Sequence, residues 1–168
     1  LLQEQSNAFE VKSLKHIPNL GLNYEGEKLR TSLDIGLLNT SMNTENFVSG
    51  NSFDRSFNNL YLRSNIRYEF KRGTSARFSY RNETQIPSIR QLQPVVDVSN
   101  PLNIVIGNPE LRPTYSHNLN LNYNNFDYTT RSGFGSYASF NFTNDDVVSL
   151  TTTDEDLVRT TTYTNVDG

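Results

Sequence analysis

The sequence predicts an all-β chain whose strands form an antiparallel up-and-down sheet of about seven or eight strands. Three observations support this fold class. Apolar and polar residues alternate with period two over most of the 168 residues, a pattern typical of strands. The connections alternate between short turns and long polar loops. Large aromatic residues gather beside the short turns.

The first predicted hairpin begins near residue 19. Apolar residues from Leu20 to Tyr24 alternate with polar ones, and Gly26-Glu27 then supplies a tight turn, because glycine tolerates a positive φ. The return strand keeps the alternation from residue 29 to residue 37. Residues 39–56, rich in Asn, Ser and Thr, are predicted to form a polar loop.

The second predicted hairpin has the most strongly charged face. Its apolar face begins with Leu60, Leu62 and Ile66, and Lys71-Arg72-Gly73 turns the chain back. Residues 84–113 then form a long connection that holds most of the prolines. The charged residues that share the other face are Arg63, Arg67, Glu69, Arg77 and Arg81.

The third predicted hairpin pairs an apolar face with a row of asparagines. Leu119, Leu121 and, on the return strand, Phe140 share the apolar face. A last, Thr-rich strand is expected at roughly 157–166, after a solvated acidic loop at 151–156. The asparagines that alternate with the leucines include Asn118, Asn120 and Asn122.

Alternation alone also fits a soluble β-sandwich with its charged face toward water. The unequal connections and the aromatic residues favour a segment of a transmembrane β-barrel, which has short turns at one rim, long loops at the other and aromatic girdles. Burial of these charged side chains in a dry core would cost roughly several kcal/mol for each one, whereas a water-filled lumen removes most of that cost. The residues predicted to face lipid are therefore Leu60, Leu62, Ile66, Leu119, Leu121 and Phe140. The residues predicted to face the lumen are Arg63, Arg67, Glu69, Arg77, Arg81, Asn118, Asn120 and Asn122.

Composition excludes several other classes. The chain has no cysteine, which removes thiol catalysis and Cys-ligated zinc, and its net charge of −3 argues against nucleic-acid binding. The only histidines, His16 and His117, are far apart, and an interfacial role is expected for His117. No catalytic residues, metal site or cofactor are predicted, so we expect a protein that is not an enzyme.

The segment from Asn100 to Pro113, N-P-L-N-I-V-I-G-N-P-E-L-R-P, resembles a signature of TonB-dependent outer-membrane receptors. The similarity is greatest to the large barrel proteins of Bacteroidetes-type bacteria, including the SusC-like group. Residues 87–92 and 163–168 are similar to that family too, so the resemblance spans roughly 58–168. Its prolines fix φ and bias the residues before them to extended conformations. The signature residues are Gly107, Asn108, Pro109, Leu111 and Pro113.

The resemblance implies a bacterial outer-membrane importer with an amino-terminal plug inside a barrel of about 22 strands. Such a protein takes up a nutrient with energy transmitted by TonB, and a surface lipoprotein is a further partner in some members. On this interpretation residues 1–168 are a partial barrel domain without plug or signal peptide. Residues 84–113 would help to shape the outer mouth.

Two alternatives remain open at this stage. A complete eight-stranded barrel would show a self-closed sheet, and a soluble β-sandwich binding module or adhesin would cover Leu62, Ile66, Leu119 and Leu121 with a second sheet. The segment expressed alone is predicted to self-associate through its unpaired edge strands. The imported compound is not indicated by any motif.

Overall fold

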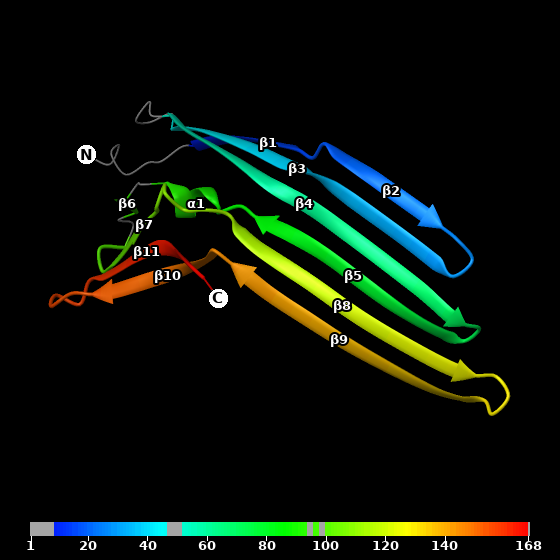
Figure 1. Ribbon diagram of the computed structural model, residues 1–168. Helices are drawn as coiled ribbons and strands as arrows, with labels where there is room; N and C mark the ends of the chain where they lie inside the picture. Colours follow the sequence, from blue (N-terminus) through cyan, green and yellow to red (C-terminus); the bar gives the residue numbers. More distant parts are fainter. Residues whose placement is uncertain (1–8, 47–51, 94–95, 98–99, 168) are drawn as a thin grey trace.

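The computed structural model describes residues 9–46, 52–93, 96–97 and 100–167. These residues form two sheets and one four-residue helix (Figure 1). None of the helical structure in this part of the chain is long and apolar enough to cross a membrane. The elements are β1 Phe9–His16, β2 Asn19–Glu25, β3 Leu29–Asn46, β4 Ser52–Lys71, β5 Thr74–Gln85, α1 Ile89–Leu92, β6 Val96–Asp97, β7 Asn103–Ile106, β8 Thr114–Asp127, β9 Ser132–Asn144, β10 Asp146–Thr153 and β11 Arg159–Val166.

The larger sheet has seven strands in the order β1-β3-β4-β5-β8-β9, with β2 also paired to β3. All of its strand pairs are antiparallel. β1 and β2 run along one edge and are separated at Pro18, which has no N–H to donate to the ladder. The carbonyl of Pro18 still accepts a hydrogen bond from the N–H of Leu37, at 3.1 Å. The predicted all-β, up-and-down antiparallel fold is confirmed.

Short turns join the strands at one end of this sheet, as the sequence predicts (Figure 1). Gly73 has φ +84°, and a Cβ there would lie 2.3 Å from the carbonyl oxygen of Phe126, so only glycine fits. The turn at Gly26 also forms, but the predicted reason was wrong, because the φ of Gly26 is not positive. Its small size instead leaves room for the Tyr24 ring, whose hydroxyl oxygen would lie 2.8 Å from a Cβ.

The prediction of a polar loop at residues 39–56 was wrong. β3 continues to Asn46, β4 already begins at Ser52, and the two strands remain paired throughout these extensions. The abundance of Asn, Ser and Thr suggested a loop, yet these residues occupy mainly one face of the extended strands. Residues 47–51 lie outside the described part of the chain.

The two faces of the β3-β4 pair exchange polarity at the Leu37–Leu60 pair. Side chains alternate between faces along a strand, so each face can be read from every second residue. We call the part between the short turns and the Leu37–Leu60 level the wall. Along β3 one face changes from Leu29, Leu33, Ile35 and Leu37 to Asn39, Ser41, Asn43 and Glu45, and the other changes from Arg30, Ser32 and Asp34 to Leu38, Thr40 and Met42.

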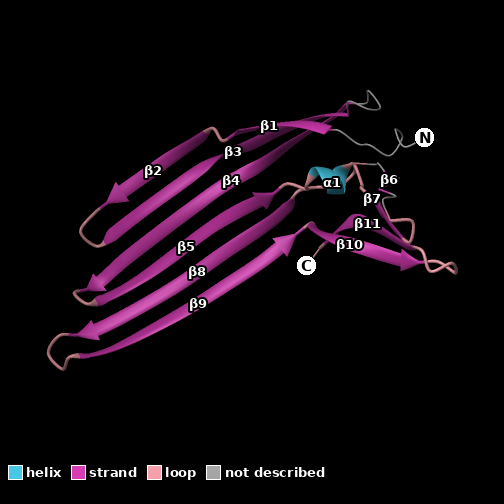
Figure 2. Cartoon of the chain, turned by 180° about the vertical axis from the view of Figure 1, so that it is seen from behind, coloured by secondary structure: helices cyan, strands magenta, loops and turns pink. Residues whose placement is uncertain are grey.

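The second sheet, in the order β10-β11-β7-β6, leaves the end of β9 and lies beyond the wall (Figure 2). β10 was not predicted, and the acidic loop expected at 151–156 narrows to a turn in which Asp154 accepts the N–H groups of Asp156 and Val158 at 3.0 and 2.9 Å. β11 lies close to its predicted position. Its parallel pairing with β7 joins segments more than fifty residues apart, which alternation cannot reveal.

A small apolar cluster closes the outer end of the long sheet, and we call it the outer core. Phe57, Leu92 and Leu111 are buried, and the side chains of Leu92 and Leu111 are each only 1% exposed. Met42, Ile86, Val147 and Tyr163 pack around them. Burial of each of these two leucines contributes about 1.5–3 kcal/mol. The outer core therefore ties β4, α1, the loop before β8 and the second sheet together.

Candidate functional site

The predicted lumen-facing residues form regular rows across the wall. The first row runs Asp34, Arg63, Arg81, Asn118 on neighbouring strands, and a row four residues further down runs Arg30, Arg67, Arg77, Asn122. The row between them is uncharged and includes Asn120. Glu69 lies on the same face, opposite Ser75. The structure thus brings all eight predicted lumen-facing side chains onto one face, which we call the polar face.

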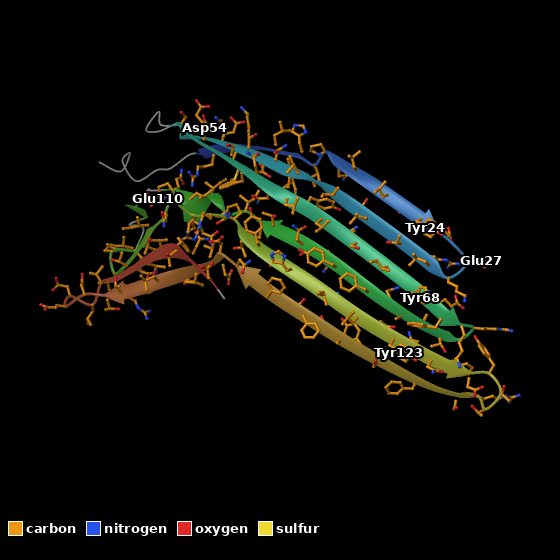
Figure 3. The ribbon with its side chains drawn as sticks, in the orientation of Figure 1. Tyr24, Glu27, Asp54, Tyr68, Glu110 and Tyr123 are labelled. Carbon is orange, nitrogen blue, oxygen red and sulfur yellow. The ribbon has the colours of Figure 1, made fainter. Side chains whose placement is uncertain are left out.

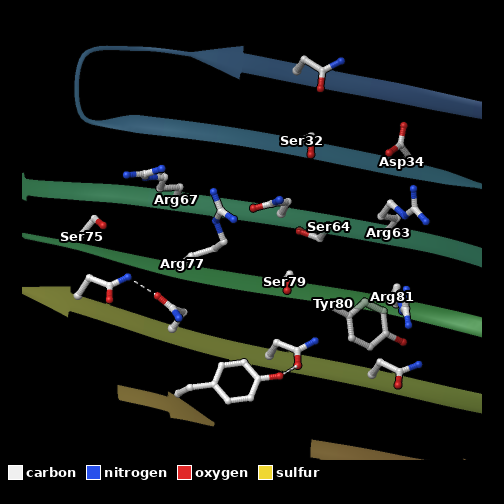
Figure 4. A pocket seen from close by; sticks show the side chains of 17 residues that line it. Ser32, Asp34, Arg63, Ser64, Arg67, Ser75, Arg77, Ser79, Tyr80 and Arg81 are labelled. Atoms are coloured by element: carbon white, nitrogen blue, oxygen red, sulfur yellow. Dashed lines mark hydrogen bonds between the residues drawn. The ribbon is translucent and has the colours of Figure 1, made fainter. Parts of the chain in front are cut away.

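The polar face lines a shallow concavity of about 1140 Å³ (Figure 4). Its lining includes the four arginines of β4 and β5 and one carboxylate, Asp34, which gives a formal charge of +3. Amide and phenol groups complete it on the β8 and β9 side, where Tyr137 donates its hydroxyl to Asn120 Oδ1 at 2.6 Å. The concavity offers many hydrogen-bond donors and little apolar surface.

The predicted lipid-facing residues share the opposite, apolar face. Leu119 pairs with Tyr80 and Phe140, and Leu121 pairs with Phe78 and Ala138. These side chains do not meet the second sheet, which contradicts the sandwich alternative. Leu20 is 77% exposed and Leu22 is 71% exposed, so this face has no covering layer in the described chain. The exposed fractions of Leu60, Ile66, Leu121 and Phe140 are 50%, 39%, 42% and 57%.

Aromatic residues concentrate at the end of the wall that carries the short turns. Tyr24, Tyr68 and Tyr123 lie toward this end, whereas Asp54 lies at the other (Figure 3). Tyr68 meets Phe70 edge to face, with ring centroids 4.9 Å apart. This placement is that of an interfacial girdle, in which rings prefer the headgroup level.

The last short turn beyond this girdle is held by Asp127. Its carboxylate accepts the N–H groups of Thr129 and Thr130 at 2.8 and 3.4 Å. These hydrogen bonds, chiefly, hold the pKa of Asp127 below its usual value. Arg72 of the neighbouring turn lies over the Tyr128 ring at 5.0 Å, so the turns contact one another at this rim.

The sheet opens between β4 and β5 at the outer end of the wall. The β4-β5 ladder stops at Arg63–Arg81, and above it the two strands pair only with β3 and β8. Asn82 occupies the opening, where its side chain accepts the N–H of Leu62 and donates to the carbonyl of Leu60, both at 2.7 Å. Sequence reasoning did not assign Asn82 a structural role, because one asparagine in an Asn-rich chain gives no signal.

The signature loop lies between β7 and β8 and packs on α1. A Cβ on Gly107 would lie 2.1 Å from the carbonyl oxygen of Gln93, so this position requires glycine. Asn108 donates its backbone N–H to the carbonyl of Gln91 at 2.6 Å and its side-chain amide to the carbonyl of Tyr163 at 3.0 Å. Leu111 enters the outer core. The loop leads directly into β8 at Thr114, as the resemblance implies.

Two further contacts fix this loop to β11 and to the junction between β9 and β10. Asn165 accepts the N–H of Arg112 and donates to its carbonyl, both at 2.9 Å. The Arg112 guanidinium forms an ion pair with Asp145 at 2.5 Å. Pro109 and Pro113 therefore lie in a loop that is hydrogen-bonded to α1 on one side and to β11 on the other.

His117 belongs to the apolar face rather than to a polar cluster. Its Nδ1 shares a 2.7 Å hydrogen bond with the Tyr80 hydroxyl, and its ring stacks on Phe142 with centroids 4.6 Å apart. Within the described residues no group of three or more His, Cys, Asp or Glu side chains could hold a metal ion.

Comparisons with known proteins agree with this architecture. Residues 3–168 match the model of the outer membrane protein beta-barrel family. A crystal structure of the siderophore receptor PirA from Pseudomonas aeruginosa is similar in fold, with a TM-score of 0.61 at 10% sequence identity. The similarity covers 96% of this chain and 38% of the PirA chain. No curated protein matches the sequence.

Because the family model matches nearly the whole chain, the chain belongs to the outer membrane protein beta-barrel family and resides in the bacterial outer membrane. It spans less than half the length of the receptor whose fold it shares.

Proposed function

We propose that this chain forms part of the barrel wall of a TonB-dependent importer that takes up a nutrient through the outer membrane. The observation that carries the proposal is the exchange of polarity between the wall and the outer end of β3 and β4. In the wall one face is polar and the other apolar, and at the outer end α1 and the signature loop pack onto the continuation of the polar face along β3 and β4, which is apolar there. This arrangement suits a lumen with an elaborated mouth for substrate capture.

The other barrel alternative fits the structure less well. A complete eight-stranded barrel needs a closed sheet, yet in the described residues β9 pairs only with β8 and the opposite edge is formed by β1 and β2. The open edges suit a segment of a larger barrel. The fold shared with a receptor of much greater length supports the same proposal.

The finer parts of the proposal rest on the signature from Gly107 to Pro113. Its resemblance to SusC-like receptors of Bacteroidetes-type bacteria supports a plug domain in the whole protein. It also supports TonB and a surface lipoprotein as partners. The polar face and the wall supply passage and capture without a chemical step, so we propose no enzymatic activity. An isolated segment of this sheet, with both edges open, would associate with further copies.

The direct test is uptake by cells that express the intact protein. Growth on a set of scarce nutrients should depend both on this protein and on TonB, and deletion of either gene should abolish the same uptake. Uptake that continues at the same rate without TonB would contradict the proposal. Passive permeation through the barrel in liposomes lacking TonB would contradict it too.

A further inference from the structure

We infer that the four arginines of β4 and β5 form a binding site for a soluble polyanion, a solute with two or more phosphate, sulfate or carboxylate groups. Arg63, Arg67, Arg77 and Arg81 lie on the polar face within the same concavity (Figure 4). The inference rests on the proposed function, because it names the class of solute that this face of the wall would take.

The arginines occur as two directly paired sets, which makes their arrangement unfavourable without an anion. Arg63 lies opposite Arg81, and Arg67 lies opposite Arg77, on adjacent antiparallel strands. Like charges at such positions destabilise a sheet, since their Cβ atoms are only about 4.5–5.5 Å apart. A bound anion between the two members of a pair would convert this repulsion into attraction.

The surrounding described residues do not neutralise these charges. Arg63, Arg67 and Arg77 form no ion pair within the described part of the chain, and Asp34, although opposite Arg63 in register, does not reach it. Only Arg81 has a carboxylate partner, Glu83, at 3.5 Å, and both side chains are exposed. The formal charge of +3 on the lining contrasts with −3 for the whole chain.

The geometry also indicates how many charges the solute carries. The two pairs are four residues apart along β4, which corresponds to about 13 Å of strand. Each guanidinium presents a planar fork of donors that suits an oxyanion. Between the pairs lie uncharged Asn65 and Ser79, which can donate to the linking part of the solute. A solute with two separated acidic groups would engage both pairs.

The test measures binding of inorganic tripolyphosphate to the intact protein in detergent by isothermal titration calorimetry. Wild-type protein should bind it, and raised salt should weaken the binding. The double variants Arg63→Gln/Arg81→Gln and Arg67→Gln/Arg77→Gln should each lose about tenfold or more in affinity. The change in electrophoretic mobility on heating checks that each variant retains a folded barrel.

The matched control is Lys71→Gln/Arg72→Gln, which removes two positive charges at a short turn away from the polar face. It should change the affinity by less than about twofold, because exposed distant charges are screened. Absence of binding by the wild-type protein, or equal losses in control and wall variants, would overturn the inference. TonB-dependent uptake of a neutral nutrient without anion binding would leave the proposed function intact and overturn only the inference.

Discussion

The wall and the outer core share the strands β3 and β4, whose two faces have opposite polarity in the two regions. In the wall, β3 and β4 turn leucine and isoleucine outward and arginine, serine and aspartate toward the polar face. Above the Leu37–Leu60 pair, Asn and Ser take the outward face, while Leu38 and Phe57 are buried on the other. In the wall the apolar side chains are exposed, unlike those of a soluble protein, whereas in the outer core they are buried, as in a soluble protein.

This difference shows where the surrounding solvent changes. A face that turns from apolar to polar along one continuous strand has left hydrocarbon and entered water. The apolar stretch of β3, from Leu29 to Leu37, covers nine residues, close to the about 9–11 residues that a tilted strand needs to cross a bilayer. We therefore propose that the outer boundary of the membrane lies at the level of the Leu37–Leu60 pair.

The largest expected effect separates packing in protein from contact with lipid. Leu111→Ala should destabilise the intact protein by about 2–5 kcal/mol, because it leaves a cavity in the outer core. The matched variant Leu121→Ala should cost clearly less, since lipid tails can fill the vacated space. Urea unfolding in vesicles measures both. An equal or greater loss at Leu121 would mean that this face is packed against protein.

The second prediction places a charge on either side of the boundary. Leu33→Arg, at the centre of the stretch from Leu29 to Leu37, should destabilise the inserted protein by about 2–4 kcal/mol. Asn43→Arg, on the same strand and face but above the boundary, should cost about 0–1 kcal/mol. Both are read from unfolding free energies in lipid vesicles. Similar costs at the two positions would remove the boundary from the Leu37–Leu60 level.

The third prediction concerns the opening where the wall meets the outer core. Asn82→Ala should cost about 1–3 kcal/mol, because the N–H of Leu62 and the carbonyl of Leu60 lose their buried partner. Asn118→Ala, which removes an amide from the polar face, should change stability by about 0.5 kcal/mol or less. Amide exchange at Leu62 should rise in the first variant only. Unchanged exchange there would show that Asn82 does not seal the opening.

The wall could be predicted from the sequence because one physical rule governs it. A sheet whose two faces meet different surroundings alternates strictly, so the sequence could predict the three hairpins, their turns and the common face of the arginines. The signature loop was also recognisable, because its residues from Gly107 to Pro113 resemble a family signature.

The outer segment could not be predicted, for an equally physical reason. Its strands bury few side chains, so Leu38, Met42 and Phe57 are spaced among many Asn and Ser residues and the alternation is weak. The pairing of β11 with β7 and the contact of Asn108 with Tyr163 join distant segments. Such contacts depend on the three-dimensional path of the chain rather than on local pattern.

The most direct test of the membrane boundary uses spin labels on single cysteines, which the native sequence lacks. Labels at Leu33, Asn43 and Met42 of the intact protein in vesicles are compared by accessibility to oxygen and to a water-soluble nickel complex. Leu33 should be open to oxygen and closed to nickel, Asn43 should show the reverse, and Met42 should be shielded from both. Shielding of Leu33 from oxygen, or equal nickel accessibility at Leu33 and Asn43, would contradict the account.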